Sequence, residues 1–117
     1  MRIKFYQKQS GKNPVAEFLN DLPSDEIARL AGCLKSVEEL GFDSPRVQFR
    51  QIKGSLWEIK IKTSRSGYRF FYVCIQKEVI VLLHAYKKQS QKAPKQDIEL
   101  AEKRMMEVYD HESTYLK

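Results

Sequence analysis

The sequence predicts a small α+β protein with a twisted, mainly antiparallel sheet of about four strands, an N-terminal helical hairpin and a C-terminal helix. Its length of 117 residues is that of a single compact domain, 1–117. Apolar residues recur at helical spacing between residues 14 and 41 and again after Pro94. Between residues 57 and 86 the pattern is instead that of strands joined by short turns.

The first part of the chain predicts one strand and a short helix. Ile3 and Phe5 alternate with polar residues, which is typical of a strand. Asn13 as N-cap and Pro14 at the first helical position begin a helix that closes near Pro23. The apolar stripe of this helix consists of Val15, Phe18, Leu19 and Leu22.

A second helix follows at once, so the two helices form a hairpin. Ser24 is the expected cap, the acidic Asp25 and Glu26 occupy the first turn, and Gly41 supplies the C-terminal stop. The apolar stripe consists of Ile27, Leu30, Ala31, Leu34 and Val37.

The middle of the chain predicts a meander of three strands. In residues 57–62 apolar and charged residues alternate, so one face is buried and the other polar. Residues 68–75 and 79–86 are apolar at nearly every position and predict strands covered on both sides, joined by tight turns at 64–67 and 76–78. The final helix has an apolar face of Ile98, Ala101, Met105 and Val108.

The composition excludes several classes of protein. No apolar run approaches the ~20 residues that span a bilayer, and residues 1–6 lack the continuous apolar stretch of a signal peptide, so we expect a cytoplasmic protein without membrane contact. Cys33 and Cys74 have no metal-type spacing and lie in apolar-patterned segments, which predicts buried, reduced thiols. We expect no metal and no cofactor.

The charge is unevenly distributed. The chain has 21 basic and 15 acidic side chains, a net charge of +6. Residues 46–95 hold twelve basic and two acidic residues, whereas both flanks are mildly acidic. Such a block favours an acidic partner, nucleic acid first, and the alternative is a merely solvated face.

Three runs in the strand-rich half resemble the RelE/HigB superfamily of toxins from type II toxin–antitoxin systems. The runs are residues 56–62, 67–72 and 82–94. In the last, a strand ending in histidine, a small residue and an aromatic is followed by two lysines, a polar stretch and proline, which is similar to the phage-derived HigB-like branch. Ile98, Ala101 and Arg104 fit the closing helix of that branch. The resemblance covers nearly the whole chain and implies a RelE-like fold.

The resemblance implies a toxin that arrests growth as a metal-independent endoribonuclease, cleaving mRNA during translation on the ribosome. It also implies a cognate helix-turn-helix, HigA-like antitoxin, with operator DNA contacted only indirectly through that antitoxin. Because the same fold carries other functions, two alternatives remain. They are a ParE-like toxin that poisons DNA gyrase and a non-catalytic relic that binds RNA or protein.

Metal-free RNA cleavage needs a base for the 2′-hydroxyl proton, a cation for the phosphate and a proton donor for the leaving 5′ oxygen. Alternation places Lys60 and Lys62 on one strand face about 7 Å apart, close to the spacing of adjacent phosphates. The resemblance maps Lys60 onto a functional base or charge. It maps Arg69 onto an arginine whose planar fork suits a phosphate clamp.

The proton donor is left open between three residues. Lys88 matches a position where RelE members have an arginine that protonates the leaving oxygen. Tyr86 and His84 are the alternatives, although Tyr86 also suits stacking on a base. His84 shares an alternation phase with Leu82 and is equally interpreted as a hydrogen-bonded core histidine.

Further residues complete the expected site. Glu58 departs from the lysine of some RelE members, and it either acts as a base or pairs with Arg50 or Lys60. The remaining side chains expected to bind RNA are Lys62, Arg65, Lys87, Lys92, Arg50 and Lys53.

Overall fold

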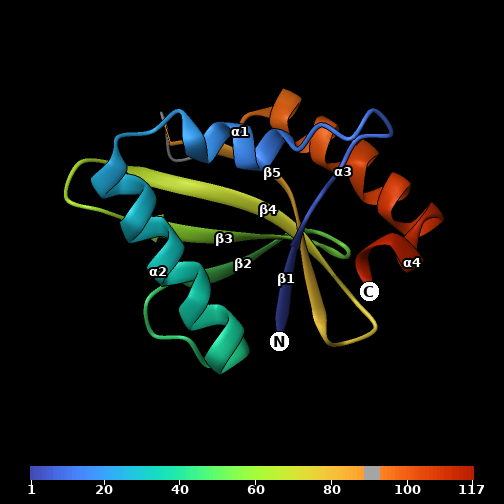
Figure 1. Ribbon diagram of the computed structural model, residues 1–117, viewed down its shortest axis with the longest axis horizontal. Coiled ribbons are helices and arrows are strands. Elements are labelled where there is room, and N and C mark those ends of the chain that lie inside the picture. Colours follow the sequence, from blue (N-terminus) through green and yellow to red (C-terminus); the bar gives the residue numbers. More distant parts are fainter. Residues whose placement is uncertain (89–92) are drawn as a thin grey trace.

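A computed structural model describes residues 1–88 and 93–117 and confirms the α+β class (Figure 1). Its strands are β1 (Arg2–Phe5), β2 (Gln48–Lys53), β3 (Leu56–Lys62), β4 (Gly67–Ile75) and β5 (Val79–Lys87). Its helices are α1 (Pro14–Asn20), α2 (Ser24–Leu40), the 3₁₀ turn η1 (Gly41–Asp43), α3 (Lys95–Asp110) and α4 (Glu112–Tyr115).

The sheet has five strands in the order β1-β5-β4-β3-β2, and the predicted number of four is corrected accordingly. Strands β2 to β5 form the antiparallel meander, whereas β1 runs parallel to β5. The strand missing from the prediction is β2, which lies at an edge and has a bulge between Gln51 and Lys53. Its apolar residues, Phe49 and Ile52, stand three apart, so it shows no strand periodicity.

Helices cover the two faces of the sheet with separate apolar clusters. Helices α1 and α2 pack on one face, in a cluster that includes Val15, Leu30, Val37, Ile59, Ile61, Phe70, Ile80 and Leu82. Helix α3 packs on the other, in a cluster that includes Phe71, Val73, Val79, Val81, Leu83, Ala101 and Val108. Both cysteines are free thiols, Cys33 buried as predicted and Cys74 only half-buried.

The starts of the first two helices differ in how they are capped. Asn13 Oδ1 accepts a hydrogen bond from the Ala16 N–H at 3.1 Å, which confirms the predicted N-cap of α1. Ser24, the expected cap of α2, is instead its first residue, and no side chain caps this helix. The preceding Pro23 takes the cap position, and its carbonyl accepts hydrogen bonds from the first turn.

A register irregularity in β5 changes which side chains face α3. Phe71 pairs with His84, whereas its neighbour Tyr72 pairs with Leu82, so one residue of β5 is left over between them. Such a bulge reverses the side-chain phase. His84 lies on the α3 face and hydrogen bonds to Asp97 of α3, so the prediction that it shares a face with Leu82 is wrong.

Candidate anion-binding site

Side chains on the α3 face, most of them polar, form two rows that cross the strands. The first row contains directly paired residues of four neighbouring strands: Gln48, Lys60, Arg69 and Tyr86. The second row, two residues along each strand, contains Arg50, Glu58, Phe71 and His84. Rows two residues apart are separated by about 7 Å. The strand pairing thus gathers residues that are up to 38 positions apart in the chain.

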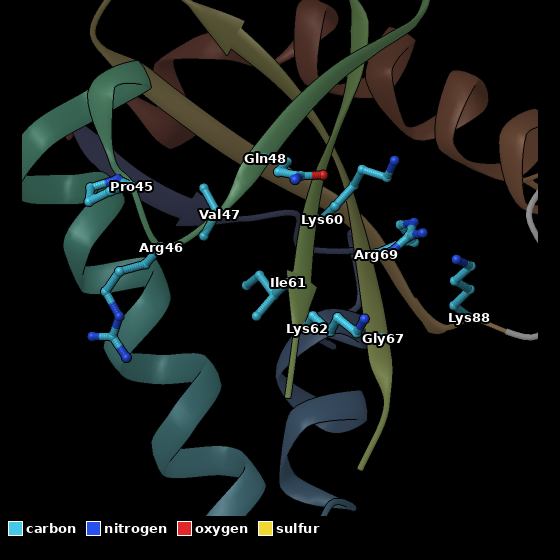
Figure 2. A pocket seen from close by; sticks show the side chains of 10 residues that line it. All are labelled: Pro45, Arg46, Val47, Gln48, Lys60, Ile61, Lys62, Gly67, Arg69 and Lys88. Atoms are coloured by element: carbon cyan, nitrogen blue, oxygen red, sulfur yellow. The ribbon is translucent and has the colours of Figure 1, made fainter. Parts of the chain in front are cut away.

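A pocket of about 460 Å³ opens where β3 ends and β4 begins (Figure 2). It is lined by Pro45, Arg46, Val47, Gln48, Lys60, Ile61, Lys62, Gly67, Arg69 and Lys88. Among these described lining residues five are basic and none is acidic. Arg46 differs from the other four, because its guanidinium is directed toward α2, where Nη1 lies 3.2 Å from the position a Cβ on Gly32 would take.

Gly67 lies between two cations of the pocket. A Cβ at this position would lie 3.5 Å from Lys88 Cδ and 3.7 Å from Arg69 Nη1. The Lys88 N–H donates to the Gly67 carbonyl at 2.8 Å, which holds the backbone of Lys88 beside the start of β4. A Cβ here would thus be in ordinary van der Waals contact with both side chains, and Gly67 marks the point where they come together.

Lys60 is the most perturbed cation of the pocket. Burial lowers the pKa of its ammonium group, the positive charges of Arg50 and Arg69 lower it further, and Glu58 opposes them in part. Arg69 lies directly opposite on β4, and like charges in this position destabilise a sheet. A perturbed group held beside like charges in a pocket is typical of a functional site.

Arg69 and Glu58 form the buried wall beside Lys60. Arg69 is only 8% exposed although it lines the pocket, and Glu58 is 0% exposed. Oε1 of Glu58 lies 2.9 Å from Nη2 of Arg50 and 3.5 Å from Nε of Arg69. Of the alternatives for Glu58, the pairing with Arg50 is therefore observed.

His84 and Tyr86 lie beside the pocket and do not line it. His84 Nε2 hydrogen bonds to Asp97 Oδ1, and its ring stacks on Phe71 with centroids 6.2 Å apart. Burial lowers the pKa of His84 despite the opposing effect of Asp97. Burial and the nearby charge of Glu58 raise the pKa of Tyr86 to about 12, so its phenol is protonated at neutral pH.

Of the other side chains expected to bind RNA, Lys62 is the only one within residues 1–88 and 93–117 that lines the pocket. Arg65, in the β3–β4 turn, pairs with Asp25 of α2 at 2.8 Å. Lys53, at the end of β2, pairs with Glu102 of α3 at 3.3 Å.

The last two residues of this set are Lys87 and Lys92. Lys87 is exposed and pairs with Tyr68, in the opposite side-chain phase to Tyr86. Lys92 lies outside the described residues.

Sequence reasoning did not single out Gln48 and Arg46 as parts of the site. Gln48 lies opposite Lys60 only because β2 pairs with β3, and β2 has no strand periodicity to reveal it. Arg46 precedes β2 and belonged to the basic block, but nothing in its neighbourhood marks it as a lining residue. Gly67 was part of the turn and the resembling motif, and its place between Lys88 and Arg69 depends on the pairing of β4 with β5.

The mixed sheet, the helices on both faces and the cationic pocket define a small α+β protein with a candidate anion-binding site. A family model of phage-derived Gp49-like proteins (DUF891) matches residues 17–106, and the chain belongs to this family. The family is of the toxin (RelE/HigB-like) type, and the matched range contains every residue that lines the pocket. A search of curated proteins found no match.

Two properties of the described part of the chain complete the description. Residues 1–88 and 93–117 contain no group of three or more His, Cys, Asp or Glu side chains that could hold a metal ion. None of the helices in these ranges is long and apolar enough to cross a membrane. The polar side chains that line the pocket carry ammonium, guanidinium and amide groups.

Proposed function

We propose that this protein is the HigB-like toxin of a toxin–antitoxin module and cleaves mRNA, during translation on the ribosome, as a metal-independent endoribonuclease. The observation that supports this most is the convergence of Lys60, Arg69 and Lys88 in one pocket, whose described lining residues include no carboxylate. The toxin-type family of the chain agrees with it. Cations so placed match the charge that develops on a phosphate during cleavage.

In the proposed reaction Lys60 is the base and Arg69 the phosphate clamp. The neutral amine of Lys60 removes the proton of a ribose 2′-hydroxyl, and the 2′ oxygen attacks the neighbouring phosphorus. The bond to the 5′ oxygen breaks, which leaves a 2′,3′-cyclic phosphate and a 5′-hydroxyl. Arg69 stabilises the nonbridging oxygens, because a guanidinium stays charged and donates two parallel hydrogen bonds.

The proton for the leaving oxygen comes from Lys88 or Tyr86. Lys88 lines the pocket, and Tyr86 lies directly opposite Arg69 with its phenol protonated. His84 is one row further from the pocket, and its Nε2 is engaged with Asp97. We therefore assign His84 a supporting role in the stacked group that it forms with Phe71 and Tyr86.

The proposed partner is a HigA-like helix-turn-helix antitoxin encoded by the same module. An antitoxin that presents acidic side chains would neutralise the cations of the pocket, as RNA would. Contact with operator DNA would then occur only through the antitoxin. The site of action would be the cytoplasm, where translated messages are found.

The mechanism is tested with purified protein and a message that is being translated in a reconstituted system. We expect products with a 2′,3′-cyclic phosphate and a 5′-hydroxyl, and no cleavage where the attacking ribose carries a 2′-deoxy substitution. Products with a 5′-phosphate, or cleavage at the 2′-deoxy position, would contradict the mechanism. Double-strand DNA breaks with intact messages would instead identify a ParE-like toxin, and binding without cleavage a relic.

A further inference from the structure

Glu58 is a buried carboxylate within a sheet, next to the pocket. Its side chain is 0% exposed and lies in the second row, between Arg50 on β2 and Phe71 on β4. Among the described residues neither of its oxygens has an aligned hydrogen-bond donor, and Nε of Arg50 lacks an aligned acceptor. Its contacts are thus ion pairs of imperfect geometry, which are costly to bury. A polar group kept in such a place calls for a functional explanation.

The geometry does not suit Glu58 as a proton acceptor. A general base must come within hydrogen-bond reach of the proton that it removes. Glu58 does not line the pocket, whereas Lys60 and Arg69 do. Its row lies about 7 Å behind theirs along the strands.

The contacts of Arg69 point to a different role for Glu58. Nε of Arg69 lies 3.5 Å from Glu58 Oε1, and Nη1 donates to the Tyr68 carbonyl at 3.4 Å. Two contacts on different nitrogens set the plane of the guanidinium. On the other side of Glu58, Arg50 at 2.9 Å anchors the carboxylate to the neighbouring strand.

We propose that Glu58 is a positioning residue, which holds the guanidinium of Arg69 at the wall of the pocket where an RNA phosphate binds. This inference rests on the proposed function. Without the carboxylate, three cations from three adjacent strands, Arg50, Lys60 and Arg69, are left with mutual repulsion only. Arg69 then turns away from Lys60 toward water, and the clamp is lost.

Whether removal of Glu58 weakens or strengthens RNA binding distinguishes a positioning role from a purely electrostatic effect. Loss of a negative charge beside a cationic pocket ordinarily strengthens the binding of an anion. A base role predicts unchanged or tighter RNA binding together with loss of cleavage. The positioning role predicts weaker RNA binding, because the clamp is no longer oriented.

The test measures binding of a short RNA by fluorescence anisotropy. Every ribose of this RNA is 2′-O-methylated, so it has no free 2′-hydroxyl and cannot be cleaved. We expect Glu58→Gln to weaken binding about tenfold, which corresponds to about 1.4 kcal/mol. The matched control is Glu78→Gln, the same change on an exposed carboxylate in the turn before β5, which should leave binding within about twofold. The Arg69 Nε–H signal in ¹H–¹⁵N spectra should shift in Glu58→Gln and not in the control.

Unchanged or tighter binding by Glu58→Gln, with the Arg69 signal in place, overturns the inference. If Glu58→Gln does not fold, Glu58→Asp decides, because it keeps the charge but withdraws it from Arg69: weaker binding supports the positioning role and unchanged binding overturns it. Failure of the proposed function gives a different result. If the pocket is not an RNA site, the unmodified protein does not bind the RNA and Arg69→Gln changes nothing; if it binds RNA without cleaving it, only the cleavage assay of the unmodified protein fails.

Discussion

Lys60 and Arg69 face each other across β3 and β4, where two cations destabilise the sheet in the absence of an anion. Neither is paired in the way of an ordinary surface cation: Arg69 is buried against Glu58, and Lys60 lies within the field of Arg50, Arg69 and Lys88. A bound phosphate would relieve the repulsion between them. The same arrangement that weakens the free protein would therefore strengthen its complex with a bound phosphate.

Replacement of Arg69 tests whether this pair of cations binds a phosphate. We expect Arg69→Gln to weaken binding of a non-cleavable RNA by at least about tenfold, because a bidentate charged contact is lost. Arg2→Gln is the control, since Arg2 lies on β1 and pairs with Glu78. Dissociation constants are compared at one salt concentration, because binding to phosphates depends steeply on salt. Equal losses in both variants would contradict the assignment of Arg69.

The lowered pKa of Lys60 predicts the pH dependence of cleavage. Since a base acts in its neutral form, the rate should rise with pH and level off at a pH below 10.5, the ordinary value for lysine. Lys60→Met should abolish the rise together with the cleavage while RNA binding is largely retained. Single-turnover rates between about pH 6 and pH 10 measure this. A rise that persists in Lys60→Met would assign the base elsewhere.

At the scale of single residues, the sequence predicts those site residues that share a strand or a motif. Lys60 and Lys62 follow from alternation, and Arg69 from the resembling motif, and the structure places all three in one pocket. The partners of Glu58 depend on cross-strand and diagonal neighbours. Those neighbours are set by the pairing of β2 with β3, and no sequence periodicity in β2 predicts this pairing.

Among the elements, the β4–β5 turn stores a local strain that is separable from the site. Gln76 and Lys77, the first two of the three residues between the strands, adopt positive φ values of 52° and 60°, a conformation that Asn and Gly adopt more readily. The turn lies at the opposite end of β4 from the pocket.

Replacing Gln76-Lys77 with Asn-Gly should therefore stabilise the protein by about 0.5–1 kcal/mol without changing RNA binding. Urea unfolding and anisotropy measure the two effects. A loss of stability would contradict the turn geometry.

Helix α3 is attached to the bulged part of β5 by a buried arginine. Arg104 Nη1 donates to the Leu83 carbonyl at 2.9 Å, and its guanidinium lies 5.0 Å from the centroid of the Tyr6 ring. The bulge next to Leu83 is what brings His84 onto the α3 face. Arg104 thus supports the element that carries His84 and Tyr86.

We expect Arg104→Met to lower the free energy of unfolding by about 2 kcal/mol, because it leaves a buried carbonyl without its charged donor. Lys103→Met, an exposed neighbour on the same helix, should change it by less than about 0.5 kcal/mol. Denaturant unfolding of both variants gives the comparison. Similar values for the two would show that the Arg104 contact contributes little.

At the scale of elements, helices α1, α2 and α3 were predictable from their helical period and β3 from its alternation, whereas β4 and β5 were predictable as continuous apolar runs bounded by turn residues. The edge strand β2 was not, because an edge strand needs few apolar residues. The bulge in β5 was hidden for a related reason, since a strand that is apolar on both faces carries no phase that a sequence pattern can reveal.

For the whole molecule, the net charge of +6 is less informative than its distribution. Some cations of the central block are paired with carboxylates of the helices. Arg65 pairs with Asp25 of α2, and Lys53 pairs with Glu102 of α3. The pocket has five basic residues and no lining carboxylate among the described residues. The charge asymmetry of the sequence therefore becomes a local positive site at one end of the sheet.

The most direct test of the proposed activity is to express the protein in bacteria and map the 5′ ends of cellular RNA. We predict growth arrest and new 5′ ends confined to translated regions of messages, with both effects lost in Arg69→Gln at equal protein level. Intact messages in arrested cells, or the same new ends produced by Arg69→Gln, would contradict the claim that this pocket cleaves RNA.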